Sequence, residues 1–501
     1  MMDLEKYILS IDQGTTGTTA LVVNQGGDVC GQGYRAVREI YPKPGWVDQN
    51  PIELIDSCEY AILEALRNAN VHPSECISVG ITNQRETTLV WEKDSGNPVS
   101  DAIVWECRRT SRICEELKSQ GLSEQIRDRT GLPIDAYFSA TKLRWILDNI
   151  PDGQSRAQRG ELLFGTVDSW IIWNLTDGRN HVTDITNASR TMMFNLHSKD
   201  WDDFILDLLN IPRNLLPEIK PSSGIFGHAN NGLFEGCDMP ISGVIGDQQS
   251  ALFGQGCISS GSAKNTYGTG SFLLLNTGGE LTVSTEGLIT IPAWGIDSDI
   301  TYALEGSIFS TGAAVQWLKD GIGVIEQIAD VETLASSVPN NGGVFVVPAF
   351  SGLGAPYWDM YARGAILGLT RGSNAAHISR ATLESIAFQS RDVLESMQKD
   401  FGQNISSLRV DGGGSENRLL MQIQANMLGV PIERSAVLQS TGMGAANMAG
   451  LAVGFWKSIE EVANRWRSDV VFDPEISIDE REDLYSRWKI AVSRASDWAD
   501  E

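Results

Sequence analysis

Histidine and cysteine are scarce in this chain of 501 residues, which contains five histidines and seven cysteines. The histidines show no metal-ligand spacing and no C-x-x-C pair is present, so a zinc site is not expected. An odd number of scattered cysteines favours a reducing compartment, and we predict a cytoplasmic protein.

Positive charge is also in short supply, because 39 lysines and arginines stand against 64 aspartates and glutamates, a formal net charge of −25. Nucleic acids and anionic membranes are polyanions, so the chain is predicted to bind neither. No apolar run approaches the roughly 20 residues that cross a bilayer, and the pattern of a signal peptide is missing. Any phosphate site must therefore be built from local donors and a metal ion.

Helix-like and strand-like segments alternate along the chain, which is typical of the α/β class. A length of 501 residues exceeds what one hydrophobic core usually serves, so two domains are expected. A strand–turn–strand pattern at residues 7–27 recurs at residues 263–279, which indicates an internal duplication. We place the boundary near residues 253–256 and predict domains of residues 1–253 and 254–501.

Capping residues and apolar spacing predict several helices. Asn50 followed by Pro51 is a typical helix start, and Gly429 is a typical helix end. The helix that follows Pro51 has an apolar face made of Ile52, Ile55, Cys58, Ile62, Ala65 and Leu66. Residues 441–456 are rich in glycine and alanine, which predicts a helix that packs close to a neighbour.

Three glycine-rich turns follow or flank predicted strands, at residues 12–17, 268–270 and 412–414. Glycine lets the backbone approach a ligand closely, and exposed N–H groups in such turns bind anions. The hydroxyls of Thr15, Thr16 and Thr269 can donate further hydrogen bonds to phosphate oxygens. Asp12 cannot face a phosphate without a bridging cation, so Mg²⁺ is expected beside it. Neither a Walker A motif nor a dinucleotide fingerprint is present, so these turns predict a nucleotide cradle of another kind.

Runs of characteristic residues recur across the chain. They are DQGTT, ITNQRETTLVWEKDSG, IVWECRRT, ELLFGTVDSWIIW, TNASRT, GDQQSALFGQ, KNTYGTG, VVPAFSGLGAPYWD and ARGAILGLTRG. Together these runs closely resemble the FGGY family of carbohydrate kinases, in particular its members that phosphorylate glycerol. The resemblance extends from about Tyr7 to Trp456, and residues 137–149 and 364–384 resemble the two signature segments of the family.

The resemblance implies an actin-like, ribonuclease-H-like ATPase fold of two domains, with the nucleotide in a cleft and a hinge between the domains. It also implies ATP-dependent phosphorylation of glycerol to sn-glycerol 3-phosphate, the entry step of glycerol catabolism, with Mg²⁺ and with ADP as the other product. We expect glycerol and ATP as binding partners and a homo-oligomer, either a dimer or a tetramer.

The residues expected around glycerol combine donors, acceptors and flat apolar faces. Arg85 next to Glu86 supplies a fork donor and a paired acceptor. Asp247 supplies the acceptor that an attacking hydroxyl needs, and the resemblance implies that it is the general base. The full set is Arg85, Glu86, Trp105, Tyr137, Asp247, Gln248 and Phe272.

The resemblance also assigns residues to the nucleotide and the metal. Asn417 could cap a helix, face the adenosine, or do both, and Gln316 is expected on a helix that starts near Thr311. Asp12 is the expected metal residue. The nucleotide residues are Thr15, Thr16, Gly17, Thr269, Gly312, Gln316, Gly413 and Asn417.

Three positions depart from the family pattern. Gly17 replaces a common serine, Thr19 stands where an arginine is frequent, and Glu106 replaces a glutamine. With Thr19 in place of an arginine, nucleotide binding would depend more on Mg²⁺ and on backbone N–H groups. The additional carboxylate of Glu106 near the polyol would change substrate preference.

Other interpretations stay open. Arg85 and Glu86 could be a surface ion pair, Asp247 could be only a helix N-cap, and Trp105 and Tyr137 could be ordinary core aromatics. The whole chain could be an FGGY kinase for xylulose or gluconate, a non-catalytic actin-like ATP switch, or a sugar-sensing regulator.

Overall fold

Strands from both halves of the chain join into one mixed sheet in the computed structural model, which describes residues 5–229 and 232–499. The strands from the first half, starting at the sheet edge, are β3 (Val29–Ala36), β2 (Gly17–Asn24), β1 (Tyr7–Gln13), β5 (Cys76–Asn83), β14 (Met239–Gly246) and β13 (Ser223–Ala229). The sheet continues through β17 (Ile289–Ile296), β18 (Asp299–Ile308), β16 (Ser271–Gly278), β15 (Ala263–Tyr267), β21 (Leu408–Asp411), β22 (Ile432–Ser435) and β23 (Ser468–Phe472).

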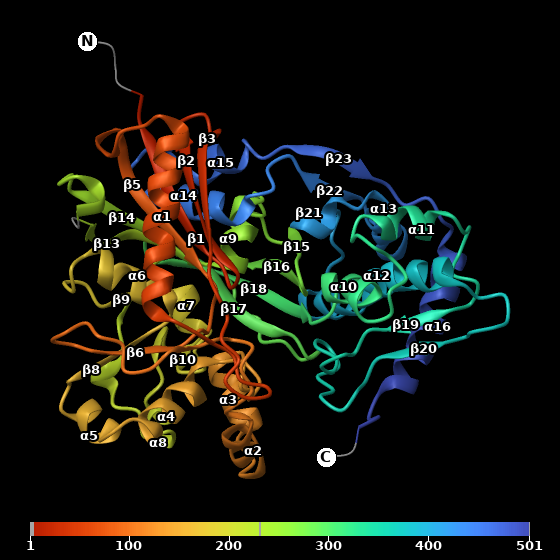
Figure 1. Ribbon diagram of the computed structural model, residues 1–501, viewed down its shortest axis with the longest axis horizontal. Coiled ribbons are helices and arrows are strands. Elements are labelled where there is room, and N and C mark those ends of the chain that lie inside the picture. The colour runs from red at the N-terminus through yellow and green to blue at the C-terminus, as the bar shows by residue number, and fades with distance from the viewer. Residues whose placement is uncertain (1–4, 230–231, 500–501) are drawn as a thin grey trace.

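Helices cover this sheet on both lobes of the molecule (Figure 1). Those of the first half are α1 (Pro51–Ala69), α2 (Ser111–Ser119), α3 (Ser123–Thr130), α4 (Ser139–Asn149), α5 (Gly153–Gln158), α6 (Val167–Leu175), α7 (Ile185–Ser189), α8 (Asp203–Leu208) and α9 (Asp247–Gly254). Those of the second half are α10 (Gly312–Asp320), α11 (Asp330–Ser336), α12 (Ala375–Phe401), α13 (Arg418–Leu428), α14 (Ser440–Ala452), α15 (Ile459–Ala463) and α16 (Ile478–Ala495).

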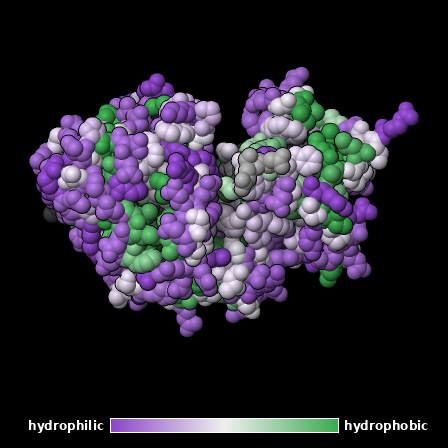
Figure 2. Space-filling view, turned by 90° about the horizontal axis from the view of Figure 1, so that it is seen from below, coloured by the Kyte–Doolittle hydropathy of each residue, from purple (hydrophilic) through white to green (hydrophobic). Residues whose placement is uncertain are grey.

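Short strand pairs complete the lobes. They are β4 (Asp48–Gln49) with β7 (Ala102–Ile103), β6 (Leu89–Glu92) with β8 (Leu162–Gly165), β9 (Val182–Asp184) with β12 (Glu218–Lys220), β10 (Phe194–Asn195) with β11 (Asp200–Trp201), and β19 (Phe345–Val347) with β20 (Ala365–Leu367). Figure 2 shows a notch in the molecular surface between the two lobes.

Both predicted hairpins are present. Strands β1 and β2 pair antiparallel around the 14–16 turn, with Gln13 opposite Thr18. Strands β15 and β16 pair in the same way around residues 268–270, with Tyr267 opposite Ser271. Each turn follows a strand that is largely buried in the sheet, so the strands fix the position of the residues at their ends.

The predicted small-residue helix, α14, comes from the second half of the chain but packs on β1, β5, β14 and α9 of the first lobe. In Figure 1 it lies among the red and orange strands. A Cβ atom at Gly80 on β5 would lie 2.2 Å from the Ala445 carbonyl oxygen, so this contact needs glycine. The division into domains 1–253 and 254–501 stays a prediction.

Helix α1 starts as predicted, since the Asn50 side chain accepts hydrogen bonds from Ile52 N at 2.8 Å and Glu53 N at 3.4 Å. Its buried residues include Leu54 and Cys58, whereas the Ile52 side chain is 49% exposed, so the predicted apolar face is only partly buried. At 3.6 residues per turn Ile52 points about 200° away from Leu54, away from the sheet.

The cysteines show no pairing, and all seven are free. None of the helices in residues 5–229 and 232–499 is long and apolar enough to cross a membrane.

Candidate active site

Buried charged side chains meet where β5 ends, α9 begins and β18 crosses the sheet. Arg85 donates to both carboxylate oxygens of Glu305, from Nη1 at 2.6 Å and from Nη2 at 3.1 Å. Its Nε lies 3.1 Å from Oδ1 of Asp247. The Arg85 and Glu305 side chains are 2% and 0% exposed, so the guanidinium is held in one orientation.

Glu86 pairs with Arg85 as predicted, but Arg190 is its closer partner. Its carboxylate accepts from Nε of Arg190, while its distance to Nε of Arg85 is 4.0 Å. Arg190 also lies 3.2 Å from Glu305, so two arginines and two glutamates alternate in one network. All four side chains are buried, and the surface ion pair considered for Arg85 and Glu86 is therefore excluded.

The backbone at Glu86 is strained, with φ of 60° in the left-handed region. Such a conformation costs on the order of 1 kcal/mol or more in a residue other than glycine. Its carbonyl oxygen accepts from the Thr88 hydroxyl at 2.9 Å, the Ser139 hydroxyl at 3.0 Å and the Lys142 ammonium at 3.4 Å. These donors offset the strain and fix the Glu86 backbone, while Arg190 holds the side chain.

Three predicted aromatic residues surround the charged network. The ring of Trp105 lies 5.5 Å from that of Tyr137 and 6.4 Å from that of Phe272, both edge-on. Burial raises the pKa of the Tyr137 phenol, so its hydroxyl keeps its proton. The Trp105 indole N–H donates to the Thr15 hydroxyl at 2.9 Å, which joins this cluster to the β1–β2 turn.

Asp12 and Asp247 place two carboxylates near one another at the edge of the cluster. Burial and the negative charge of Asp247 raise the pKa of Asp12 to about 7. Asp247 is the first residue of α9, whose N-cap is Gly246, so Asp247 is not the cap itself. A side-chain carboxylate pair of this kind favours a cation.

The described residues contain no group of three or more His, Cys, Asp or Glu side chains arranged to hold a metal ion. Mg²⁺ is usually held by one or two carboxylates together with substrate phosphates and water, so Asp12 with its neighbour Asp247 fits that ion.

The first glycine-rich turn carries Thr15, Thr16 and Gly17. The Thr15 carbonyl accepts from the Gln49 amide at 2.6 Å, and Thr16 is exposed. A Cβ atom at Gly17 would lie 2.5 Å from the Tyr34 hydroxyl oxygen. The half-exposed Tyr34 ring thus lies over Gly17, and a side chain at this position would have to displace it.

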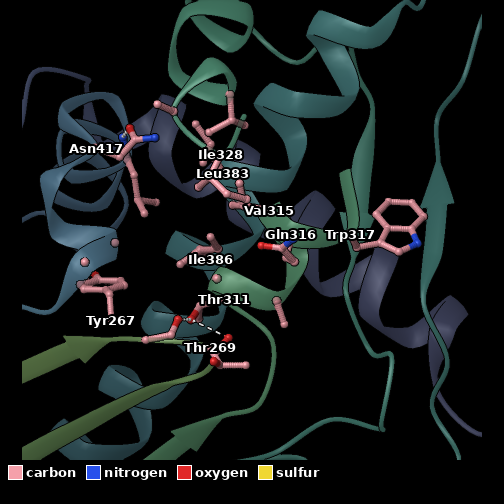
Figure 3. A pocket seen from close by; sticks show the side chains of 18 of the residues that line it. Tyr267, Thr269, Thr311, Val315, Gln316, Trp317, Ile328, Leu383, Ile386 and Asn417 are labelled. Carbon is pink, nitrogen blue, oxygen red and sulfur yellow. Dashed lines mark hydrogen bonds between the residues drawn. The ribbon is translucent and has the colours of Figure 1, made fainter. Parts of the chain in front are cut away.

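The second and third turns line a cavity of about 1100 Å³ in the second lobe (Figure 3). The first turn does not line it and lies instead beside the charged network and its aromatic residues, to which the Trp105–Thr15 hydrogen bond joins it. The predicted nucleotide residues that line the cavity are Thr269, Gly312, Gln316, Gly413 and Asn417.

Apolar side chains form one wall of this cavity, and Val315, Leu383 and Ile386 are visible there in Figure 3. Polar groups gather elsewhere on its surface. Asn417 is the N-cap of α13, accepting from Leu420 N at 2.8 Å, and it also lines the cavity. A wall of aliphatic side chains with polar groups around it suits a flat heterocycle attached to a sugar.

Helix α10 begins at the cavity, as predicted. Thr311 is its N-cap residue, and Gln316 lines the cavity from its second turn. A Cβ atom at Gly312 would lie 2.5 Å from the Gly268 carbonyl oxygen, so α10 and the second turn approach closely only because Gly312 is glycine. Trp317 points away from the other labelled side chains in Figure 3 and packs on Phe350, with ring centroids 5.3 Å apart.

Sequence reasoning missed Glu305, Arg190 and Lys264. Each is fully buried, yet charged residues are rarely buried without a partner. A charge within a mostly apolar strand segment, as at Glu305 after Ala303 and Leu304, was the available signal, whereas Lys264 lies among polar residues and gave none. Glu106, by contrast, is exposed beside Glu39 and Arg108 and lies outside the buried cluster.

Comparison with known proteins gives matches along most of the chain. Residues 7–254 match the N-terminal domain of the FGGY family of carbohydrate kinases, and residues 263–453 match its C-terminal domain. The chain is 57% identical to glycerol kinase 2 of Thermotoga maritima over 493 residues, which is 98% of this chain and 99% of that protein. It is 54% identical to glycerol kinase of Alkaliphilus oremlandii, with 99% of each covered.

A solved structure of Plasmodium falciparum glycerol kinase with ADP superimposes with a TM-score of 0.92 at 36% identity, covering 98% of each chain. These matches confirm the predicted two-domain α/β kinase fold. The chain belongs to the FGGY family of carbohydrate kinases.

Proposed function

We propose that this protein transfers the γ-phosphoryl group of ATP to a primary hydroxyl of glycerol, giving sn-glycerol 3-phosphate and ADP. The observation that carries the proposal is the cluster of buried Arg85 and Glu86 with the partly exposed Asp247 beside the β1–β2 turn. The two proteins named glycerol kinase that are 57% and 54% identical to this chain support it.

Glycerol would lie between the charged network and the aromatic rings. Arg85 donates to hydroxyl oxygens, and Glu86 accepts a hydroxyl proton. The rings of Trp105 and Phe272 cover the carbon chain, and the Tyr137 hydroxyl adds a further hydrogen bond. Because these side chains are fixed by the contacts above, little rotamer freedom is lost when the polyol binds.

In the reaction, the primary hydroxyl oxygen forms a bond with the γ-phosphorus while the bond from that phosphorus to the oxygen of the departing ADP breaks. The hydroxyl proton goes to the Asp247 carboxylate. Phosphoryl transfer has a loose transition state, so orientation of the hydroxyl contributes more than the strength of the base. Arg85, at 3.1 Å from Asp247, holds that carboxylate in place.

The adenosine of ATP would occupy the cavity of the second lobe, with its base against the apolar wall and polar groups at Gln316 and Asn417. Thr269, Gly312 and Gly413 would face the phosphate chain from this lobe. Thr15, Thr16 and Gly17 would face the phosphates from the opposite side, close to the polyol.

Asp12 would hold a Mg²⁺ ion, with Asp247 close by. When bound, the ion neutralises charge on the phosphate oxygens. The protein's net charge of −25 does not attract ATP, so binding of the nucleotide would depend more strongly on a Mg²⁺ ion at Asp12.

The proposal is tested by a coupled ADP-release assay on the purified chain with glycerol, xylulose and gluconate. Glycerol is expected to give by far the highest kcat/KM. A preference for xylulose or gluconate, or ATP turnover without any polyol, would contradict the proposal.

We also propose that residues 1–253 and 254–501 are the two domains and that the chain forms a homo-oligomer, a dimer or a tetramer. Sedimentation equilibrium of the purified protein tests the oligomer, and limited proteolysis tests the boundary.

A further inference from the structure

Lys264 on β15 is a fully buried lysine that the chemistry described above leaves without a role. Its Nζ lies 2.6 Å from Oε1 of Gln248 and 2.9 Å from the Thr266 hydroxyl oxygen. A lysine is seldom buried unless its charge is used, because taking an ammonium group out of water is costly.

The surroundings keep Lys264 charged. Burial lowers its pKa to about 8, and the nearby carboxylates of Asp411 and Asp247 oppose that shift. Asp411 is also buried and lies on the neighbouring strand β21, where it pairs in register with Thr266. Near neutral pH most of the protein therefore carries an ammonium group here.

A charged ammonium group can donate hydrogen bonds but cannot accept them. Of the two ends of the Gln248 amide, only the carbonyl oxygen can face it. The other end, the Gln248 NH₂ group, donates one N–H to Oδ2 of Asp247 at 3.3 Å, which leaves its second N–H for a substrate oxygen.

We propose that Lys264 is a positioning residue, which fixes the Gln248 side chain as a hydrogen-bond donor toward a substrate oxygen. The inference rests on the proposed function and deepens it. Arg85 and Gln248 then supply donors to hydroxyl lone pairs, while Asp247 and Glu86 accept hydroxyl protons. Without the lysine, the Gln248 side-chain amide is free to rotate by 180° and present its carbonyl oxygen to the substrate. The site would then gain a further hydrogen-bond acceptor beside Asp247 and Glu86 and lose a donor.

The test compares Lys264→Met with wild type in steady-state assays of the full chain, with a thermal melt of each. We expect the KM for glycerol to rise about tenfold, as for one lost directed hydrogen bond, while the KM for ATP changes less than about twofold. Thr266→Val is the matched control, since it removes the other partner of Lys264 and leaves the amide in place; its glycerol KM should stay near wild type. Equal rises in both KM values for Lys264→Met, or an unchanged glycerol KM, would overturn the inference.

Gln248→Glu keeps the inference testable if Lys264→Met does not fold. A glutamate can pair with Lys264 but lacks the N–H donors, so the glycerol KM should again rise about tenfold or more with ATP little affected. A glycerol KM near wild type in this variant would show that an acceptor suffices and would overturn the inference. A wild-type chain inactive on glycerol would refute the proposed function, whereas active wild type with unresponsive variants would refute only the role of Lys264.

Discussion

Arg85 and Glu305 form a two-pronged ion pair between residues 220 positions apart in the sequence. Arg85 follows β5 in the first half of the chain, and Glu305 lies within β18 in the second. The side chain proposed to bind the polyol is thus held by a strand from the other half of the protein.

Glu305→Gln should weaken both folding and glycerol binding, because it leaves two buried arginines with only Glu86 and Asp247 to balance them. Breaking a buried charge pair typically costs about 3–5 kcal/mol. We expect a lower melting temperature and a higher KM for glycerol with a smaller change for ATP. A variant with wild-type melting and wild-type glycerol KM would show that Glu305 does not hold Arg85.

Asp247→Asn should lower kcat by about 10²-fold or more, the usual effect of losing a general base. The asparagine keeps the size of the side chain, and α9 does not depend on Asp247 as its cap. Melting temperature and nucleotide affinity, measured on the same sample, should stay close to wild type. Unchanged turnover would remove Asp247 from the catalytic role.

Asp12→Ala should abolish most phosphoryl transfer through loss of the metal, and raising the Mg²⁺ concentration should recover part of the activity. Thr16→Ala is the milder comparison, because one exposed hydroxyl among several donors costs only about 1 kcal/mol. Activity is titrated against Mg²⁺ for both variants. If Asp12→Ala loses thermal stability but keeps wild-type Mg²⁺-ATP affinity, Asp12 only shapes the turn.

Gly312→Ala should weaken ATP binding and leave glycerol binding nearly unchanged. The new methyl group would lie 2.5 Å from the Gly268 carbonyl oxygen, so α10 or the second turn must move apart. The measurement is ATP affinity by calorimetry, with the glycerol KM at saturating ATP as the internal control. An alanine variant with wild-type ATP affinity would show that this close approach is not needed for the nucleotide.

His181 should make the protein less stable in mild acid. Burial lowers its pKa from 6.5 to about 4, and its ring packs edge-on against Trp91 while Nε2 donates to the Phe164 carbonyl at 2.8 Å. Between pH 6.5 and 4 the unfolded chain binds a proton that the folded chain does not, so this stability is lost as pH falls. The loss of unfolding free energy is on the order of 2 kcal/mol. This is less than the full pKa shift would give, because the ring is partly exposed and water reduces the cost of charging it.

The matched variant is His181→Gln, which keeps a donor for the Phe164 carbonyl but does not titrate. Its melting temperature should fall less than that of wild type between pH 7.5 and pH 5.5. An identical fall in both proteins would place the acid sensitivity elsewhere.

Local patterns predicted much of this protein from the sequence. The turns at residues 12–17 and 268–270, the start of α1 at Asn50 and the start of α10 near Thr311 depend on residues close together in the chain. Turn geometry and helix capping are short-range effects, so sequence determines them directly. The motif runs also predicted the family, which the comparisons confirm, and supplied the candidate site residues, whose roles stay predictions.

Only the tertiary structure decided which charges meet. Glu86 follows Arg85 in the sequence, but in the fold its closest partner is Arg190, 104 residues away. Arg85 in turn pairs most closely with Glu305, 220 residues away. A buried charge takes whichever opposite charge the packed strands bring within reach, and sheet register sets that choice. The same holds for Lys264 and Gln248, whose contact exists because β15 packs beside α9.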